Sequence, residues 1–219
     1  MKPNVIKSMA LSITAAAVLC GALTACVPLV LGGAAGGAMI ASDRRTSGTQ
    51  LEDEGIELRA QSRIRAAIGE RAHVNLTSYN RQVLLTGEVP SAQDKQLAEQ
   101  IVSRVENVSS VVNELAVMGN SSLRDRSSDT LVTGNVKARL LDARDLQSSA
   151  FKVVTERGTT YLMGLVTQRE ADRATAVVRG TTGVQKVVRI FEILSEEQLS
   201  GRQPMPATPQ PAAARPDGG

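Results

Sequence analysis

The middle of the chain contains an internal repeat, which restricts the fold to two copies of one small unit. Residues 83–89, Val-Leu-Leu-Thr-Gly-Glu-Val, align with residues 160–166, Thr-Tyr-Leu-Met-Gly-Leu-Val, at an offset of 77 positions. Matched segments in the same order predict two small domains rather than a single large one. The other aligned positions are Ile64 and Ile68 with Val136 and Leu140 and, after one deleted residue, Asp94, Ala98, Ile101, Val102, Val108, Val111 and Val112 with Glu170, Ala174, Val177, Val178, Val184, Val187 and Val188.

Each copy has the hydrophobic pattern of an α+β unit. Apolar residues spaced three and four apart predict helices, and β-branched alternation predicts strands. Turn residues, Asn80-Arg81 and Arg157-Gly158, separate the first two strands of each copy, and Ser91 and Thr167 can cap the second helices. We therefore predict two tandem αββαβ sandwiches, each with two layers around a small core. The predicted helices are 52–69, 91–106, 129–143 and 168–181, and the predicted strands are 73–79, 82–89, 109–118, 150–156, 159–166 and 184–194.

The first residues have the layout of a bacterial secretory signal. Lys2 and Lys7 precede an uncharged apolar run from Met9 to Leu19. The junction Leu23-Thr24-Ala25-Cys26 resembles the lipobox of bacterial lipoproteins, in which the cysteine is acylated and becomes the first residue after cleavage. With Cys26 blocked by lipid, thiolate catalysis is excluded. Val27 follows where an Asp would imply retention at the inner membrane, so we expect outer-membrane sorting with the folded part at the periplasmic face.

An alternative is one uncleaved transmembrane helix from Ala10 to Ala41, because no charge lies between Lys7 and Asp43. Pro28 and two glycine pairs make this segment a poor helix. Either anchor would leave the folded part beside a membrane surface.

These predictions divide the chain into five parts. Residues 1–25 form the signal peptide, and residues 26–50 contain the acylated cysteine and a flexible linker. The first domain covers residues 51–120 and the second covers residues 121–196. The remaining residues, 197–219, are rich in Pro, Ala and Gln without apolar periodicity, so we expect a disordered tail.

The repeated pattern resembles a known family. Leu-Thr-Gly-x-Val, an acidic residue with a helix, and then Gly or Asn before Val-x-x-Val-Val are similar to the BON domain of bacterial periplasmic proteins. Two copies behind a lipobox, together with segments 43–50 and 151–156, resemble outer-membrane lipoproteins that carry two BON domains. This resemblance implies binding of anionic phospholipid, phosphatidylglycerol or cardiolipin, through the second domain. It also implies a role in outer-membrane integrity and association with division sites.

The two copies differ in charge. Residues 51–120 carry 7 basic and 10 acidic side chains, a balance of −3, whereas residues 121–195 carry 12 and 8, a balance of +4. A basic module gains about 1 kcal/mol for each Lys or Arg placed near anionic headgroups. The second copy is therefore the better candidate for a membrane surface, unless both copies are ordinary solvated surfaces.

The first helix of the second copy has a second apolar stripe opposite its core face. The core face is Val132, Val136 and Leu140, whereas the matching helix of the first copy presents polar residues outward. A helix with an apolar edge and basic flanks can enter the headgroup boundary. Two alternatives are packing against the first copy and a protein-interaction scaffold that binds envelope partners. The predicted phospholipid-binding residues are Leu131, Gly134, Asn135, Lys137, Ala138, Arg139, Leu141 and Arg144.

Other residue types give little sign of catalysis or metal binding. His73 is the only histidine, and with no Cys or clustered carboxylate beside it in the sequence we expect a surface position or a local hydrogen bond. Gly87 and Gly164 occupy equivalent strand positions, where we expect a structural role in a close backbone approach. No phosphate loop, catalytic triad or paired carboxylates emerge, so we predict no enzyme, cofactor or metal site. With two Phe, two Tyr and no Trp, nucleic-acid binding is also disfavoured.

Overall fold

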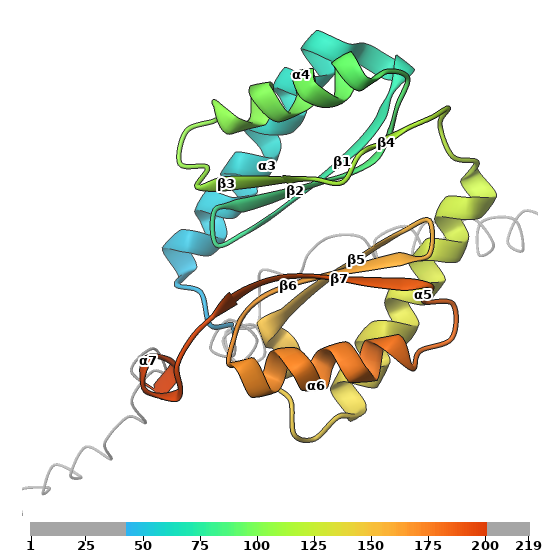
Figure 1. The fold of residues 1–219 in the computed structure, drawn as a ribbon. Helices are drawn as coiled ribbons and strands as arrows, with labels where there is room; N and C mark the ends of the chain where they lie inside the picture. The colour runs from blue at the N-terminus through green and yellow to red at the C-terminus, as the bar shows by residue number, and fades with distance from the viewer. Residues whose placement is uncertain (1–42, 201–219) are drawn as a thin grey trace, which may run out of the picture. The chain divides into compact units, whose positions relative to one another are not determined.

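The computed structural model describes residues 43–200 (Figure 1). The predicted signal peptide, Cys26 and residues 201–219 lie outside this range. Within residues 43–200, no helix combines the length and apolar character needed to cross a bilayer.

The first domain has the predicted order of helices and strands. In its sheet β1 pairs antiparallel with β2, and β2 pairs parallel with β3 and β4. The helix between β2 and β3 makes the crossover that a parallel pair requires. The predicted strand 109–118 is divided around Glu114 and Leu115. The elements are α3 (Ser47–Ile68), the 3-10 helix η2 (Gly69–Arg71), β1 (His73–Tyr79), β2 (Gln82–Val89), α4 (Ala92–Ser103), β3 (Ser110–Asn113) and β4 (Ala116–Val117).

The second domain repeats this topology. Strand β5 pairs antiparallel with β6, and β6 pairs parallel with β7. The α+β prediction of two tandem αββαβ units is therefore confirmed. The elements are α5 (Leu123–Asp142), η3 (Ser148–Ala150), β5 (Phe151–Glu156), β6 (Thr159–Val166), α6 (Gln168–Arg179), β7 (Lys186–Ile193) and α7 (Glu196–Ser200).

Each domain has its own apolar core between its helices and one face of its sheet. In the first domain Ile56, Ala60 and Ile64 of α3 pack with residues of α4, β1 and β2. In the second, Val132 and Val136 of α5 are part of the equivalent cluster. Both clusters consist of residues within 43–200, so the chain from Asp43 onward contains the residues that form its own cores.

The helical part of the repeat is displaced by one turn from the sequence alignment. Asp53, Ile56, Ala60 and Ile64 are buried along α3, and residues at the same spacing, Asp129, Val132, Val136 and Leu140, are buried along α5. Ile64 therefore corresponds to Leu140, and the alignment of Ile64 with Val136 is wrong. An amphipathic helix matches itself again after about one turn, so apolar spacing alone does not fix this offset.

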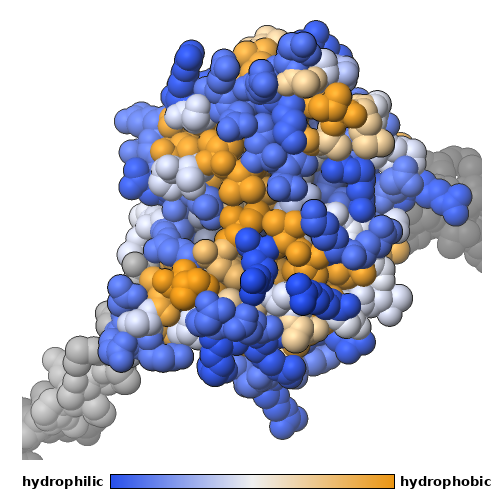
Figure 2. Space-filling view, in the orientation of Figure 1, coloured by the Kyte–Doolittle hydropathy of each residue, from blue (hydrophilic) through white to orange (hydrophobic). Residues whose placement is uncertain are grey.

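The faces of the two sheets that the helices leave uncovered pack against each other. Figure 2 shows hydrophobic residues reaching the surface across the middle of the same view. Burial raises the pKa of Tyr79 to about 12, so its hydroxyl remains a donor, and it donates to Ala150 O at 3.3 Å. At another point Asn80 Nδ2 donates to Glu192 Oε2 at 2.7 Å. The buried residues of this third cluster are Tyr79, Leu84, Tyr161, Met163, Leu165, Ile190 and Leu194.

The segment before α3 contacts both domains. The Arg44 guanidinium donates to both carboxylate oxygens of Glu170 at 2.7 and 2.8 Å and to Leu165 O at 2.8 Å. Next to it, Arg45 donates to Asp53 Oδ2 at 2.6 Å and lies over the Tyr79 ring at 4.3 Å. We call residues 43–46 the N-terminal clasp.

Two predicted boundaries are corrected by these contacts. The linker prediction over 26–50 is wrong from residue 43, because the clasp is bound and α3 begins at Ser47. The tail prediction over 197–219 is wrong for its first residues, because α7 continues to Ser200 and buries Leu199.

Candidate functional site

Helix α5 is longer at its N-terminus than the sequence pattern predicts. Ser122 caps it and forms a capping box with Asp125, in which each side chain accepts a hydrogen bond from the backbone N–H of the other residue. The Ser-x-x-Asp spacing could have identified this start. The prediction began at residue 129 because the first turns have no apolar periodicity.

The predicted phospholipid-binding residues all lie exposed on α5 or just after it. The core side of the helix is formed by Asp129, Val132, Val136 and Leu140. On the opposite side Leu131 is 71% and Leu141 is 69% exposed. Gly134 faces open space. The exposed set is Leu131, Gly134, Asn135, Lys137, Ala138, Arg139, Leu141 and Arg144.

Leu123 extends this apolar stripe, although it is not among the residues that the sequence predicts. It is 80% exposed. Leu123 precedes Leu141 by 18 residues, or about five turns, so both side chains leave the helix in the same direction. The exposed stripe, which we call the α5 stripe, consists of Leu123, Leu131, Gly134, Ala138 and Leu141.

The basic side chains beside the stripe have no acidic partner. Within the described residues, no hydrogen bond or ion pair involves the side chain of Lys137, Arg139 or Arg144. Two other arginines of the same domain are ion-paired: Arg173 donates to Asp145 and Arg189 donates to Asp172. The donors of Lys137, Arg139 and Arg144 are therefore available for charge-assisted hydrogen bonds to an external anion such as a phosphate.

The alternative that the stripe packs against the first domain is wrong. The domains do contact each other, but they do so through their sheets and the N-terminal clasp. Leu131 and Leu141 remain mostly exposed in their presence.

The equivalent helix of the first domain offers a different surface. With the one-turn correction, Gly55 takes the place of Leu131, Leu58 that of Gly134, and Arg65 that of Leu141. Leu58 is 73% exposed, so α3 has an exposed leucine of its own. It lies in a domain with a negative balance of charge.

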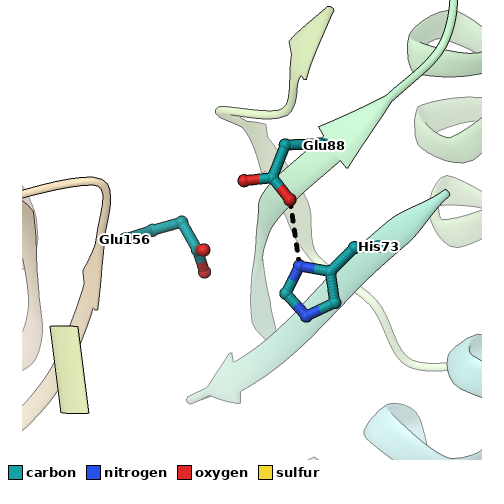
Figure 3. Close-up of side chains that lie close together, drawn as sticks. All are labelled: His73, Glu88 and Glu156. Carbon is teal, nitrogen blue, oxygen red and sulfur yellow. Dashed lines mark hydrogen bonds and ion pairs between the residues drawn. The ribbon is translucent and has the colours of Figure 1, made fainter. Parts of the chain in front are cut away.

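A polar cluster lies between the two domains (Figure 3). One ligand atom each from His73, Glu88 and Glu156 lies within 4.8 Å of the other two. The expectation of no metal site at His73 depends on the absence of clustered carboxylates, and it is wrong on this point because two carboxylates lie beside the ring. Glu88 and Glu156 are 0% and 4% exposed.

The pKa values of Glu88 and Glu156 are shifted in opposite directions. Burial acts to raise the pKa of Glu88, but hydrogen bonds from Ser121, Arg157 and His73 outweigh it, so its pKa is lowered. Burial and the nearby charge of Glu88 raise the pKa of Glu156 despite a hydrogen bond from Asn75.

The two predicted structural glycines lie where the chain passes too closely for a side chain. A Cβ on Gly87 would lie 2.0 Å from His73 O, and the φ of Gly87 is +107°. A Cβ on Gly164 would lie 2.5 Å from Ala150 O.

Comparison with known proteins agrees with this architecture. The BON domain family model matches residues 53–119 and 128–194. The chain is 37% identical over 183 residues to the outer membrane lipoprotein DolP of Haemophilus influenzae, covering 81% of this chain and 95% of that protein. It is 31% identical over 151 residues to the 21 kDa hemolysin of Actinobacillus pleuropneumoniae, covering 68% of this chain and 78% of that protein.

A third relative is the osmotically-inducible protein Y of Escherichia coli. It is 28% identical over 159 residues, which cover 69% of this chain and 77% of that protein. The BON matches cover more than half of the chain, and the Haemophilus protein is matched over nearly its whole length. This chain therefore belongs to the BON domain family, as a two-BON-domain protein like DolP.

Proposed function

We propose that this protein is a non-enzymatic lipoprotein of the cell envelope, anchored in the outer membrane through Cys26, that binds anionic phospholipid through α5. Phosphatidylglycerol and cardiolipin are the expected ligands. Such binding would support outer-membrane integrity, including at division sites. The observation that carries the proposal is the exposed α5 stripe with unpaired Lys137 and Arg139 beside it.

Two free-energy terms favour the binding of α5 to an anionic membrane. Full burial of one leucine side chain contributes about 1.5 to 3 kcal/mol, and partial insertion contributes less. Each basic group near an anionic surface adds about 1 kcal/mol and is screened by salt. These terms give weak binding by the free domain. An acylated Cys26 would hold the domain close to the membrane, so a weak site would still be occupied.

Vesicle flotation tests the proposal. We expect the soluble chain from Asp43 to Gly219 to float with phosphatidylglycerol vesicles at low salt and not with phosphatidylcholine vesicles. High salt should reduce the floating fraction. The double variant Leu131→Glu, Lys137→Glu should reduce it at least tenfold, because the apolar contact is lost and a basic group becomes acidic.

The matched control is Leu58→Glu, Arg65→Glu on α3 of the first domain. It changes the same residue classes, one leucine and one basic side chain, at exposed positions. We expect it to float like the unchanged protein. Equal loss in both variants would assign binding to net charge rather than to α5. Absence of flotation at any salt would favour a protein-interaction scaffold instead.

A further inference from the structure

The cluster of His73, Glu88 and Glu156 brings three strands of two domains to one point. His73 and Glu88 are cross-strand partners on β1 and β2, and Glu156 ends β5 of the second domain. Figure 3 shows the three side chains converging from opposite sides. A ligand held by all three would therefore join the domains.

The hydrogen bonds leave one negative charge uncompensated. Arg157 Nη1 donates to Glu88 Oε1 at 2.8 Å, and the backbone N–H and hydroxyl of Ser121 donate to Oε2 at 3.2 and 3.1 Å. Glu156 Oε2 accepts from Asn75 Nδ2 at 3.0 Å, which is a neutral donor. Arg157 balances one of the two carboxylates, so the other can be neutralised by a proton or by a bound cation.

The position of His73 is also fixed. Its Nδ1 lies 3.1 Å from Glu88 Oε2, and the missing side chain of Gly87 makes room for it. A Cβ at residue 87 would lie 3.4 Å from Nδ1 and far too close to the His73 carbonyl. The imidazole is thus directed toward the carboxylates by the local backbone.

We propose that His73, Glu88 and Glu156 bind one divalent transition-metal cation, such as zinc, between the two BON domains. One imidazole nitrogen and two carboxylate oxygens form a three-ligand set that leaves a fourth position for water. The cation replaces the hydrogen bond between His73 Nδ1 and Glu88. Glu156 offsets one of its two positive charges, while Arg157, Ser121 and Asn75 orient the two carboxylates from outside. An imidazole ligand favours zinc over magnesium or calcium.

This site is independent of the phospholipid proposal, since none of its residues lies on α5. The chain from Asp43 onward contains no cysteine, and His73 is its only histidine. Zinc binding through an imidazole or a thiolate therefore has a single possible source, His73. This allows an unusually clean test with an untagged protein.

The test is thermal unfolding of the chain from Asp43 to Gly219 with zinc chloride or magnesium chloride, paired with NMR of the His73 ring. We expect zinc at about a hundredfold excess over its Kd to raise Tm by about 5 to 10 °C. Magnesium should not do so. The ring signals of His73 should shift with zinc at a one-to-one ratio.

Two variants decide whether the three residues form the site. Glu156→Gln and His73→Ala should abolish the zinc-dependent rise in Tm, and their Tm without metal shows that they fold. The control is Glu192→Gln, which changes another carboxylate between the domains, one bonded to Asn80. It should respond to zinc like the unchanged protein. An unchanged Tm and unshifted His73 signals would overturn the proposal, as would an equal zinc response in Glu156→Gln.

Discussion

A buried aspartate supports the β-hairpin of each domain at the level of single residues. Asp53 accepts hydrogen bonds from the backbone N–H groups of Asn80 and Arg81, both of which have positive φ. In the second domain Asp129 accepts from the N–H groups that follow β5, with distances of 2.7 and 3.0 Å. Positive φ at both central residues is typical of the type I′ turn that two-residue hairpins favour. The carboxylate stabilises a turn that costs strain in residues other than glycine.

We expect Asp129→Ala to lower the free energy of unfolding by about 2 to 3 kcal/mol. The change leaves two backbone donors at the turn without their buried acceptor. Urea unfolding followed by circular dichroism measures the effect. Asp142→Ala, at an exposed position of the same helix, is the control and should change stability by less than about 0.5 kcal/mol. Equal stability of the two variants would contradict this role of Asp129.

Asp142 itself lies on the side of α5 that carries the stripe, one turn after Ala138. Its exposed carboxylate opposes the positive charge of the stripe's surroundings. We expect Asp142→Asn to increase binding to phosphatidylglycerol vesicles by about fivefold at low salt, the equivalent of about 1 kcal/mol. Glu54→Gln on α3 removes an exposed acidic charge from the first domain and should leave vesicle binding unchanged. A similar gain in both variants would mean that net charge alone sets affinity.

At the level of helices and strands, the predicted caps Ser91 and Thr167 are confirmed. In α6 the capping box adds Glu170, which is buried and bonded to Arg44. The hydrogen bond from Arg44 and those from Thr167 outweigh burial and lower the pKa of Glu170. A lowered pKa in the folded state stabilises the protein at neutral pH. This contribution is lost as the pH falls below about 4.5, the ordinary value, and through the folded pKa.

We expect Arg44→Gln to lower the free energy of unfolding by about 3 kcal/mol at pH 7, because it leaves a buried carboxylate without its cation. The difference from the unchanged protein should shrink as the pH falls and Glu170 becomes protonated. Urea unfolding between pH 7 and pH 3 tests both points. Arg65→Gln, at an exposed helical position, is the control. A difference that stays constant with pH would show that Arg44 acts without the charge of Glu170.

The strands were easier to predict than the helix ends. Alternation and turn residues gave 73–79, 82–89 and 159–166 as the structure has them. Both first helices begin earlier than predicted, because Thr46 and Ser122 cap polar turns that show no apolar period. The clasp could not be predicted, since the partners of Arg44 lie more than 100 residues away.

In the candidate sites, too, features set by neighbouring residues could be predicted, whereas those set by contacts between distant residues could not. Helical periodicity was enough to identify an outward stripe on α5, although not its extension to Leu123. The pairing of His73 with Glu88 follows from a two-residue turn at Asn80 and Arg81, which fixes the strand register. The approach of Glu156 depends on how the two domains contact each other, which neither the internal repeat nor the hydrophobic periodicity of the sequence predicts.

At the scale of the described molecule, two domains of opposite charge share a buried apolar interface. Their contact covers the open faces of both sheets, which would otherwise expose apolar surface. The helices α3 and α5 keep exposed leucines in this arrangement. One duplicated unit can thus provide both an internal interface, through its sheet, and an external surface, through its first helix.

The N-terminal clasp has a mechanical consequence. A chain tethered at Cys26 would transmit any tension into the fold through Asp43, and neighbouring arginines there attach to different domains. A load would be divided between the two domains instead of peeling α3 away from its own core. Ion pairs loaded together resist a pull better than a helix end opened one turn at a time. The clasp would thus let the fold bear a force applied through the tether while the domain interface stays closed.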